Sequence, residues 1–373
     1  FTTPVLGLTF YWVGNTIGNA KTGLYSTGIN NDWSNPDNWT LISGLYTGAN
    51  TCIPGPHDDV VFDASSFNAG GGTVDIDLVV QGCNNMLWTG IPAGISLDGS
   101  LTETNRELIV FGDLELHGNL DNQFEALITF SAHDVGTRTI TNNGAQFFGR
   151  IDFEFSGGTW SILDNMDMNG GTRADVNFIS GTVLANAIIF DGPDTQTSRQ
   201  EILSNGSPFY NLSINRETNG GGNANFCELE DPLTVDSDLN IQRGGLADRG
   251  FQITGNAFGN LTIEDAARIV LGESGLLTTF PTDFLSVNID LNERGRTYYN
   301  SDLTQIVSSV PTYGALYLQN HDGSLVDKIL DGPITINDIL SIGNYNNFMD
   351  DGFQITGDAG EELQMDPNAQ LTI

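Results

Sequence analysis

The sequence is short of positive charge, and this shortage excludes two classes of partner. Lysine and arginine together number 13 among 373 residues, against 47 aspartates and glutamates, which gives a formal net charge of −34 at pH 7. A surface this acidic repels nucleic acid and anionic lipid, so neither is expected as a partner. The charge balance suits a secreted protein, a cation-rich medium or a surface loaded with calcium.

Other common features are absent as well. No apolar run approaches the roughly 20 residues that a membrane span needs, and long amphipathic helical patterns are nearly missing. The sequence holds no phosphate-binding loop, no Cys/His zinc cluster and no nucleophile elbow. It shows no signal peptide, and its last strand, 370–373, has no polar cap. We therefore expect the chain to be part of a longer polypeptide, whose other domains are its nearest partners.

Cysteine is scarce too. The three cysteines, Cys52, Cys83 and Cys227, are compatible with one disulfide, for which we favour the pair Cys52 and Cys83. Closing that loop of about 30 residues would stabilise the fold by roughly 3–4 kcal/mol in the chain-entropy model. Cys227 is then left over, either as a buried apolar thiol, which is the favoured interpretation, or as a link to a partner chain.

What the sequence does contain is an internal duplication. The hexapeptide Gly-Phe-Gln-Ile-Thr-Gly at 250–255 returns unchanged at 352–357, and its neighbours recur in step, since Pro232-Leu-Thr-Val is matched by Pro333-Ile-Thr-Ile. A repeat of about 100 residues is too long for one turn of a common solenoid, so each copy must hold several coils. Short strands of alternating apolar and polar residues recur inside it roughly every 20 residues, the spacing that a β-helix coil requires.

This pattern predicts an all-β fold, namely a right-handed parallel β-helix of on the order of 15 coils. The 45 glycines, with abundant Asn and Asp, supply turn positions that need a positive φ angle. An antiparallel sandwich array is the alternative, and the scarcity of tight two-residue hairpin signals argues against it. The predicted parts are a capping module at 1–90, β-helix coils at 91–205, a first repeat unit at 206–305 and a second, incomplete unit at 306–373.

Aromatic residues gather near the start of the chain. The segment Trp33-Ser-Asn-Pro-Asp-Asn-Trp39 has turn-forming residues at its centre, which bring two indoles near each other. If they are exposed, Trp33, Trp39 and Trp88 can stack on sugar rings, as aromatic residues do in carbohydrate-binding modules. The favoured interpretation is that the aromatic segment is a plug, which covers the first coil as a terminal cap must.

Five motifs follow one another in the first 90 residues: Tyr11-Trp-Val-Gly, Trp33-Ser-Asn-Pro-Asp-Asn-Trp39, Cys52-Ile-Pro-Gly-Pro-His-Asp-Asp-Val-Val-Phe-Asp63, Gly72-Thr-Val-Asp-Ile and Cys83-Asn-Asn-Met-Leu-Trp88-Thr-Gly. In this order of motifs the segment resembles the opening module of large repetitive cell-surface proteins of Bacteroidota, such as gliding-motility adhesins of the SprB type. The resemblance implies export by the type IX secretion system, a secreted or outer-membrane-attached location at the cell surface, and an oxidised Cys52–Cys83 pair. The remaining residues resemble that group only in style, and no ligand is implied.

Polysaccharide lyases and glycoside hydrolases are common among parallel β-helices, so an enzyme is the alternative function. Such enzymes use clustered carboxylates, or calcium with an arginine or lysine as base. The chain lacks the Asn-Thr-Asp and Gly-His-Gly motifs of the polygalacturonase-like group, its four histidines are scattered, and its basic residues are too few and too dispersed to predict a lyase cleft. We expect no catalysis; a cleft in which carboxylates converge with an arginine or lysine would favour the enzyme.

Acidic residues crowd several turns, and calcium takes about six to eight oxygen ligands from carboxylates and turn carbonyls. The candidate ligands, none of which lies in a known calcium-loop motif, are Asp75, Asp77, Glu228, Glu230, Asp231, Asp248, Asp350 and Asp351. The favoured competing interpretation is a solvated acidic surface that opposes aggregation. The sequence therefore predicts a structural and adhesive segment of a bacterial surface protein that contacts polysaccharide, with no certain cofactor and Ca²⁺ as the candidate.

Overall fold

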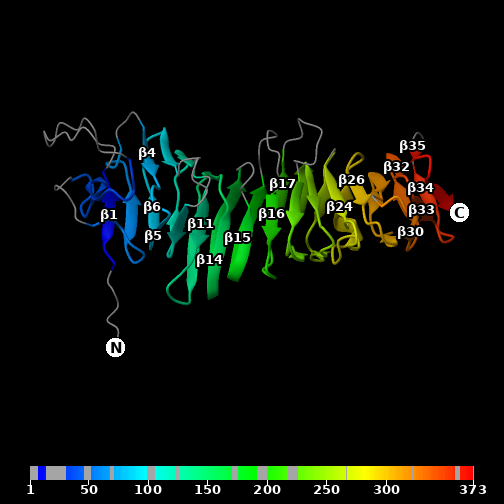
Figure 1. Ribbon diagram of the computed structural model, residues 1–373, viewed down its shortest axis with the longest axis horizontal. Helices are drawn as coiled ribbons and strands as arrows, with labels where there is room; N and C mark the ends of the chain where they lie inside the picture. Colours follow the sequence, from blue (N-terminus) through cyan, green and yellow to red (C-terminus); the bar gives the residue numbers. More distant parts are fainter. Residues whose placement is uncertain are drawn as a thin grey trace. The chain divides into compact units, whose positions relative to one another are not determined.

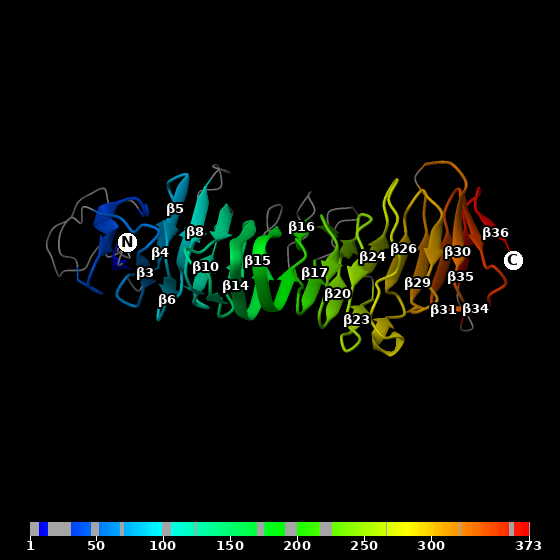
Figure 2. The ribbon, with the colours of Figure 1, turned by 90° about the horizontal axis from the view of Figure 1, so that it is seen from below.

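The chain is an all-β solenoid, built from stacked parallel strands. A computed structural model describes residues 7–13, 31–45, 52–67, 71–98, 106–122, 124, 126–169, 175–190, 200–216, 226–265, 267–320, 322–357 and 362–372. Helical structure in these ranges is limited to 3-10 turns such as η1 (Pro36–Asn38) and η3 (Ser286–Asn288). The chain forms two compact units, Phe1–Asn186 and Ala187–Ile373, and within each unit the strands lie side by side (Figures 1 and 2).

The strands of the first unit, the last of which continues into the second, are short except for two. They are β1 (Thr9–Trp12), β2 (Trp39–Thr40), β3 (Asp59–Phe62), β4 (Gly72–Asp75), β5 (Val80–Cys83), β6 (Met86–Trp88), β7 (Ile95–Asp98), β8 (Glu107–Val110), β9 (Leu114–Glu115), β10 (Leu120–Asn122), β11 (Leu127–Phe130), β12 (Thr137–Thr141), β13 (Gln146–Phe147), β14 (Ile151–Met168) and β15 (Val176–Phe190).

The strands of the second unit are all short. They are β16 (Gln200–Leu203), β17 (Leu212–Asn215), β18 (Phe226–Leu229), β19 (Leu233–Thr234), β20 (Leu239–Arg243), β21 (Gly245–Ala247), β22 (Ile253–Thr254), β23 (Leu261–Ile263), β24 (Arg268–Leu271), β25 (Ile289–Leu291), β26 (Arg296–Tyr299), β27 (Gln305–Val307), β28 (Thr312–Tyr313), β29 (Ala315–Leu318), β30 (Val326–Leu330), β31 (Ile334–Ile336), β32 (Ile339–Ile342), β33 (Asn346–Met349), β34 (Ile355–Gly357), β35 (Glu362–Met365) and β36 (Gln370–Thr372).

Strands pair with the equivalent strand of the next coil, in parallel and in register. In the second unit one sheet runs through β18, β21, β24, β26, β29, β32 and β35. In β24 and β26 buried residues alternate with partly exposed ones, and equivalent side chains form columns across the sheet. One inward column joins Leu246, Ile269, Thr297 and Leu316, all of them fully buried. The alternating pattern in the sequence correctly predicts this arrangement.

The coils are longer and fewer than the sequence spacing indicates. Hydrogen bonds between equivalent corners join residues 22 positions apart at Asn260 and Asp238, and 28 positions apart at Ser274 and Asp302. The described strands therefore complete about 11 coils, where the spacing of short strands predicts about 15. The estimate was too high because one coil holds several strands as well as corners of variable length.

A tight turn recurs at the corners of the coils. At Asp248 and at Asp350 the carbonyl accepts a hydrogen bond from the amide three residues later, at 2.8 and 2.9 Å. The two central residues have positive φ in both cases, with 51° and 86° at 249–250 and 50° and 83° at 351–352. This is the pattern of a type I′ turn. Asn142 and Ser204 begin further turns of the same kind.

The structure confirms the internal duplication. The repeated hexapeptide begins at the last central residue of a type I′ turn in both copies. It continues into β22, where Ile253 pairs with Leu233, and into β34, where Ile355 pairs with Ile334. The same turn and the same strand pairing therefore recur in the two copies, in the register that the sequence alignment predicts.

Aromatic rings fill the core of the first unit. Trp33, Trp39 and Trp88 have exposed fractions of 0%, 0% and 1%. The Trp39 ring meets the Trp33 ring edge-on, with centroids 4.8 Å apart, and its Nε1 donates to the Trp33 carbonyl at 2.8 Å. Trp88 stacks on Phe62 at 3.8 Å. The prediction that these three indoles contact carbohydrate is therefore wrong, because the rings pack on one another inside the unit and present no face to a sugar.

The predicted Cys52–Cys83 disulfide is absent. Cys83, the last residue of β5, points into the core and is fully buried, whereas Cys52 is exposed. Burial and the neighbouring Asp59 raise the pKa of the Cys83 thiol well above its ordinary value. Cys227 is also buried, as the favoured interpretation predicts, and its Sγ lies 3.7 Å from the Gln200 side-chain oxygen.

Candidate functional site

The predicted calcium ligands in the first unit are bound by protein groups. Asp75 forms an ion pair with Arg106 at 3.0 Å. Asp77 accepts hydrogen bonds from the Ser34 backbone amide and hydroxyl, and from the Gln81 side chain at 3.2 Å. The Asp77 carboxylate thus holds Ser34 against the segment that follows β4, while the Asp75 carboxylate ties β4 to Arg106. Their role in this arrangement is to fasten neighbouring segments together.

The predicted ligands at 228–231 are separated from one another. Glu230 pairs with Arg249, and Asp231 accepts hydrogen bonds from the amide and hydroxyl of Ser204, at 2.7 and 3.0 Å. Glu228 lies within β18, before the corner that holds Glu230 and Asp231, and is 7% exposed. The sequence places these three residues in one turn, but the strand and its corner direct them to different neighbours.

The predicted ligands at 248 and 350–351 belong to the type I′ corners. Asp248 accepts hydrogen bonds from the amides of Gly250 and Gly272, at 2.9 and 2.7 Å, and from the Thr278 hydroxyl. Burial raises the pKa of Asp248 to about 6, although these hydrogen bonds lower it. Asp350 accepts from Gly352 at 2.9 Å, and Asp351 is a central turn residue. Among the described residues, no three His, Cys, Asp or Glu side chains converge as a metal site would require.

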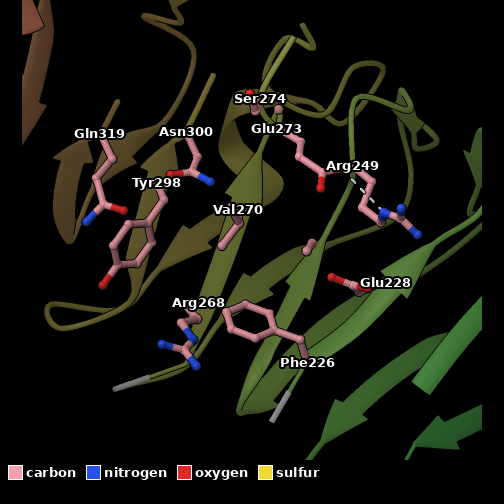
Figure 3. Close-up of a pocket in the computed structure, with 12 residues that line it drawn as sticks. Phe226, Glu228, Arg249, Arg268, Val270, Glu273, Ser274, Tyr298, Asn300 and Gln319 are labelled. Atoms are coloured by element: carbon pink, nitrogen blue, oxygen red, sulfur yellow. Dashed lines mark hydrogen bonds and ion pairs between the residues drawn. The ribbon is translucent and has the colours of Figure 1, made fainter. Parts of the chain in front are cut away.

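The second unit has a groove that the sequence did not predict. It lies on the outer face of the sheet formed by β18, β21, β24, β26 and β29, and encloses about 460 Å³ (Figure 3). The groove exists because its floor is made of small residues, namely Ala247 on β21 and Val270 on β24. Larger side chains on either side of that floor leave the space open.

The walls of the groove carry charged and aromatic side chains. Phe226 and Glu228 stand on β18, and Tyr298 stands on β26 at the opposite side. The Tyr298 ring stacks on the ring of Tyr317 in the next coil, with centroids 4.6 Å apart and planes at 13°. Asn300 and Gln319 add planar amide groups at the same side. The lining therefore combines an aromatic surface with several hydrogen-bonding groups.

The two arginines of the groove lining differ in their partners. Arg249 bridges two carboxylates at a corner, since it contacts Glu230 and lies 3.3 Å from Glu273. Partial burial acts to lower the pKa of Arg249, but the two glutamates outweigh it and the pKa is raised. The guanidinium of Arg268 lies over the Phe226 ring, 4.0 Å from its centroid. Burial lowers the pKa of Arg268.

Sequence reasoning missed this site because its residues are far apart in the chain. The basic residues that the sequence scatters converge here, since strands β18, β21, β24 and β26 bring Phe226, Gly245, Arg268 and Arg296 into one in-register row. The one signal in the sequence that could have indicated this site is the number of residues per coil. Arranging the sequence by coils, with the duplicated segment as a guide, would have aligned Arg268 with Arg296.

Comparison with known proteins adds no relative to this picture. No family model, curated protein or solved structure matches the chain. Among the described residues, no helix has the length and apolar character that a membrane crossing requires. The groove geometry is therefore the main structural guide to function.

Proposed function

We propose that the chain is a structural and adhesive segment of a secreted or cell-surface bacterial protein, and that it holds polysaccharide in the groove on β18, β21, β24, β26 and β29. The observation that supports this proposal most directly is the lining of the groove. An aromatic ring, Tyr298, stands beside planar hydrogen-bonding groups on Asn300 and Gln319. Sugars present apolar ring faces and rims of hydroxyl groups, and such a lining complements both.

The position of the groove also supports a polymeric ligand. Its residues come from five successive coils, on or next to paired strands of one sheet that are spaced about 4.8 Å apart. A chain lying across the strands can thus meet similar groups from coil to coil. The same proposal includes right-handed winding of the coils and a capping role for residues 1–90, together with surface display as in the adhesins that this segment resembles.

A polysaccharide-cleaving enzyme is the second candidate function, and one observation favours it. Glu228 and Glu273 line the same groove as Arg249 and Arg268, which is the combination of carboxylate and base that such an enzyme uses. Against it, the Glu273 carboxylate is already engaged in an ion pair with Arg249 at 3.3 Å. Binding without cleavage is therefore the better supported function.

Isothermal titration of the full chain with neutral and acidic oligosaccharides tests this proposal. Replacement Tyr298→Ala removes the aromatic wall, and we expect it to weaken binding by about tenfold, since stacking and burial together contribute on the order of 1–2 kcal/mol. Tyr210→Ala is the matched control, because Tyr210 is 54% exposed and is absent from the groove lining. Equal affinity for all three proteins would reject the groove as the binding site.

The same samples distinguish adhesion from catalysis. After overnight incubation, chromatography of the oligosaccharides should recover the input chains intact. New reducing ends or unsaturated products, abolished by Glu228→Gln, would establish the enzyme and displace the adhesive function.

A further inference from the structure

Two arginines lie side by side on the sheet that forms the groove. Arg268 on β24 and Arg296 on β26 are in-register partners on adjacent parallel strands. Both are partly exposed, and both point to the outer face, because the alternate residues Ile269 and Thr297 are buried. Strands so paired lie about 4.8 Å apart, so the two side chains leave the sheet as close neighbours. Like charges placed this way repel each other.

No carboxylate compensates this repulsion. Arg106, Arg138, Arg150 and Arg249 each have an acidic partner within ion-pair distance. Among the described residues of this very acidic chain, Arg268 and Arg296 have none. Burial lowers the pKa of Arg268 most strongly; Tyr298, its hydrogen-bond partner, acts to raise this pKa, and the nearby Arg296 acts to lower it further. The pair thus keeps an unfavourable concentration of positive charge beside the groove, where a bound anion would relieve it.

The surroundings of the pair restrict what that anion can be attached to. The Arg268 guanidinium lies over the Phe226 ring, 4.0 Å from its centroid, and is hydrogen-bonded to the Tyr298 side chain. The Tyr298 side chain stands next to both arginines, because Tyr298 follows Arg296 by two residues on the same strand. An aromatic ring therefore lies within one side-chain length of the two guanidinium groups. A free inorganic ion would use only the arginines, whereas an acidic sugar would use the ring as well.

We propose that the groove is selective for acidic saccharides, whose carboxylate or sulfate binds between Arg268 and Arg296 while the sugar ring packs on Tyr298. This inference rests on the proposed function and adds to it the chemical class of the ligand. Planar guanidinium groups match carboxylate and sulfate geometry through paired N–H donors. The ion pair of Arg249 with two glutamates at the opposite wall makes that side suited to uncharged hydroxyl groups.

The test compares saccharides that differ only in charge. Oligogalacturonate of defined length and the same oligomer with reduced carboxyl groups form one pair of probes; a sulfated galactan oligomer and its desulfated form are the other. Affinities of the full chain are measured by calorimetry at about 0.15 M salt. We expect at least one acidic probe to bind about tenfold more tightly than its uncharged counterpart, the size of one charge-assisted contact.

Charge-removing variants locate the selectivity. Arg268→Gln and Arg296→Gln should each reduce the affinity for the acidic probe about tenfold and leave the uncharged probe unaffected. Arg243→Gln is the control, because it removes the same charge from an exposed residue of the same unit that is not part of the groove lining. Thermal unfolding of each variant establishes that it is folded before titration.

The outcomes separate this inference from the proposed function. If charged and uncharged probes bind equally, or if Arg243→Gln has the effect of Arg268→Gln, the acidic selectivity is rejected and the polysaccharide groove stands. If Arg268→Gln weakens both members of a pair alike, the arginine shapes the groove without reading charge, and the inference is again rejected. If no probe binds, both proposals fail.

Discussion

Asp248 is a carboxyl group that the fold keeps away from water. It is 1% exposed, and its two oxygens accept hydrogen bonds from two backbone amides and one hydroxyl. Burial raises its pKa to about 6, from 3.8 for the ordinary carboxyl. A residue that appears in the sequence as a potential calcium ligand is instead a fixed part of a corner, joined to two successive coils.

This raised pKa predicts a pH dependence of stability. Because the folded protein binds the proton of Asp248 more tightly than the unfolded chain, the contribution is fully present below pH 3.8 and is lost as pH rises through about 6. The loss amounts to about 3 kcal/mol at most. Urea denaturation at several pH values between 4 and 7 should show a smaller decline in Asp248→Asn than in the unmodified protein.

A second variant makes this prediction specific. The Thr278 hydroxyl donates to Asp248 and lowers its pKa, so Thr278→Val should move the decline to higher pH. Parallel pH profiles for all three proteins would show that Asp248 does not titrate in this range.

At the residue level, the sequence indicated which residues are acidic or aromatic, but not which groups they contact. It identified Asp75 as an acidic residue on a strand and Glu230 and Asp248 as acidic residues near turns, but the amides, hydroxyls and arginines that bind them come from other coils. It also identified the tryptophans as a cluster while leaving their exposure open. The partners of the acidic residues and the exposure of the tryptophans both depend on how the coils stack, and the sequence of a single strand does not determine this.

The type I′ corner is the element that the two repeat copies share most closely. Its second central residue is glycine in both, with φ of 86° at Gly250 and 83° at Gly352. The surroundings differ. A Cβ on Gly250 would lie 2.6 Å from the Leu276 Cβ, whereas a Cβ on Gly352 would meet no atom within 4 Å. Substitutions at both positions would cause backbone strain, but only a substitution at Gly250 would also cause steric crowding.

Alanine substitutions at these corners should differ in effect. Gly352→Ala should lower the free energy of unfolding by about 1–2 kcal/mol, the effect of a positive φ on a residue with a side chain. Gly250→Ala should lower it by about 1–3 kcal/mol more, because Leu276 must move aside. Chemical denaturation of both variants measures the difference. Equal losses would mean that the coil containing Leu276 yields without strain.

At the level of elements, the sequence predicted most of the fold. Alternating apolar and polar residues, such as those of β31 and β24, predicted the strands. The duplicated hexapeptide predicted which strands are equivalent in the two copies. Coil number was overestimated because corners such as 272–281 carry variable insertions between short strands. The Cys52–Cys83 disulfide failed because β5 directs Cys83 inward. A disulfide requires that both cysteine side chains point toward each other, and the spacing of cysteines in the sequence does not show this.

At the level of the whole molecule, net charge and local charge act in opposite directions. The chain carries −34 overall, while Arg268 in the groove lining and Arg296 beside it on the next strand have no acidic partner among the described residues. An acidic saccharide is thus repelled at long range and attracted at contact. Repulsion acts over the Debye length, which falls from about 30 Å at 0.01 M salt to about 8 Å at 0.15 M.

Association kinetics should expose this opposition. The association rate constant of an acidic oligosaccharide should rise several-fold between about 0.01 and 0.15 M salt, as long-range repulsion is screened. The uncharged counterpart should associate at a rate independent of salt. Stopped-flow or surface-based kinetics provides both values. A rate that falls with salt would mean that the arginine pair, and not the net charge, governs the approach of the ligand.

The groove itself was beyond reach of the sequence taken strand by strand. Its floor needs small residues on β21 and β24, and its walls need large ones on β18 and β26, so the cavity is a relation between coils. The groove can be recognised only from the register of those coils, and that register depends on corners of unequal length.

The in-register pairing of β18, β21, β24, β26 and β29 also has a consequence for descent. Each coil contributes its own side chains to the groove and is bounded by its own corners, so the exchange of one coil by recombination would change the groove lining and keep the pattern of strand pairing. If the groove binds saccharide as proposed, such exchanges would alter the ligand preference of the groove one coil at a time.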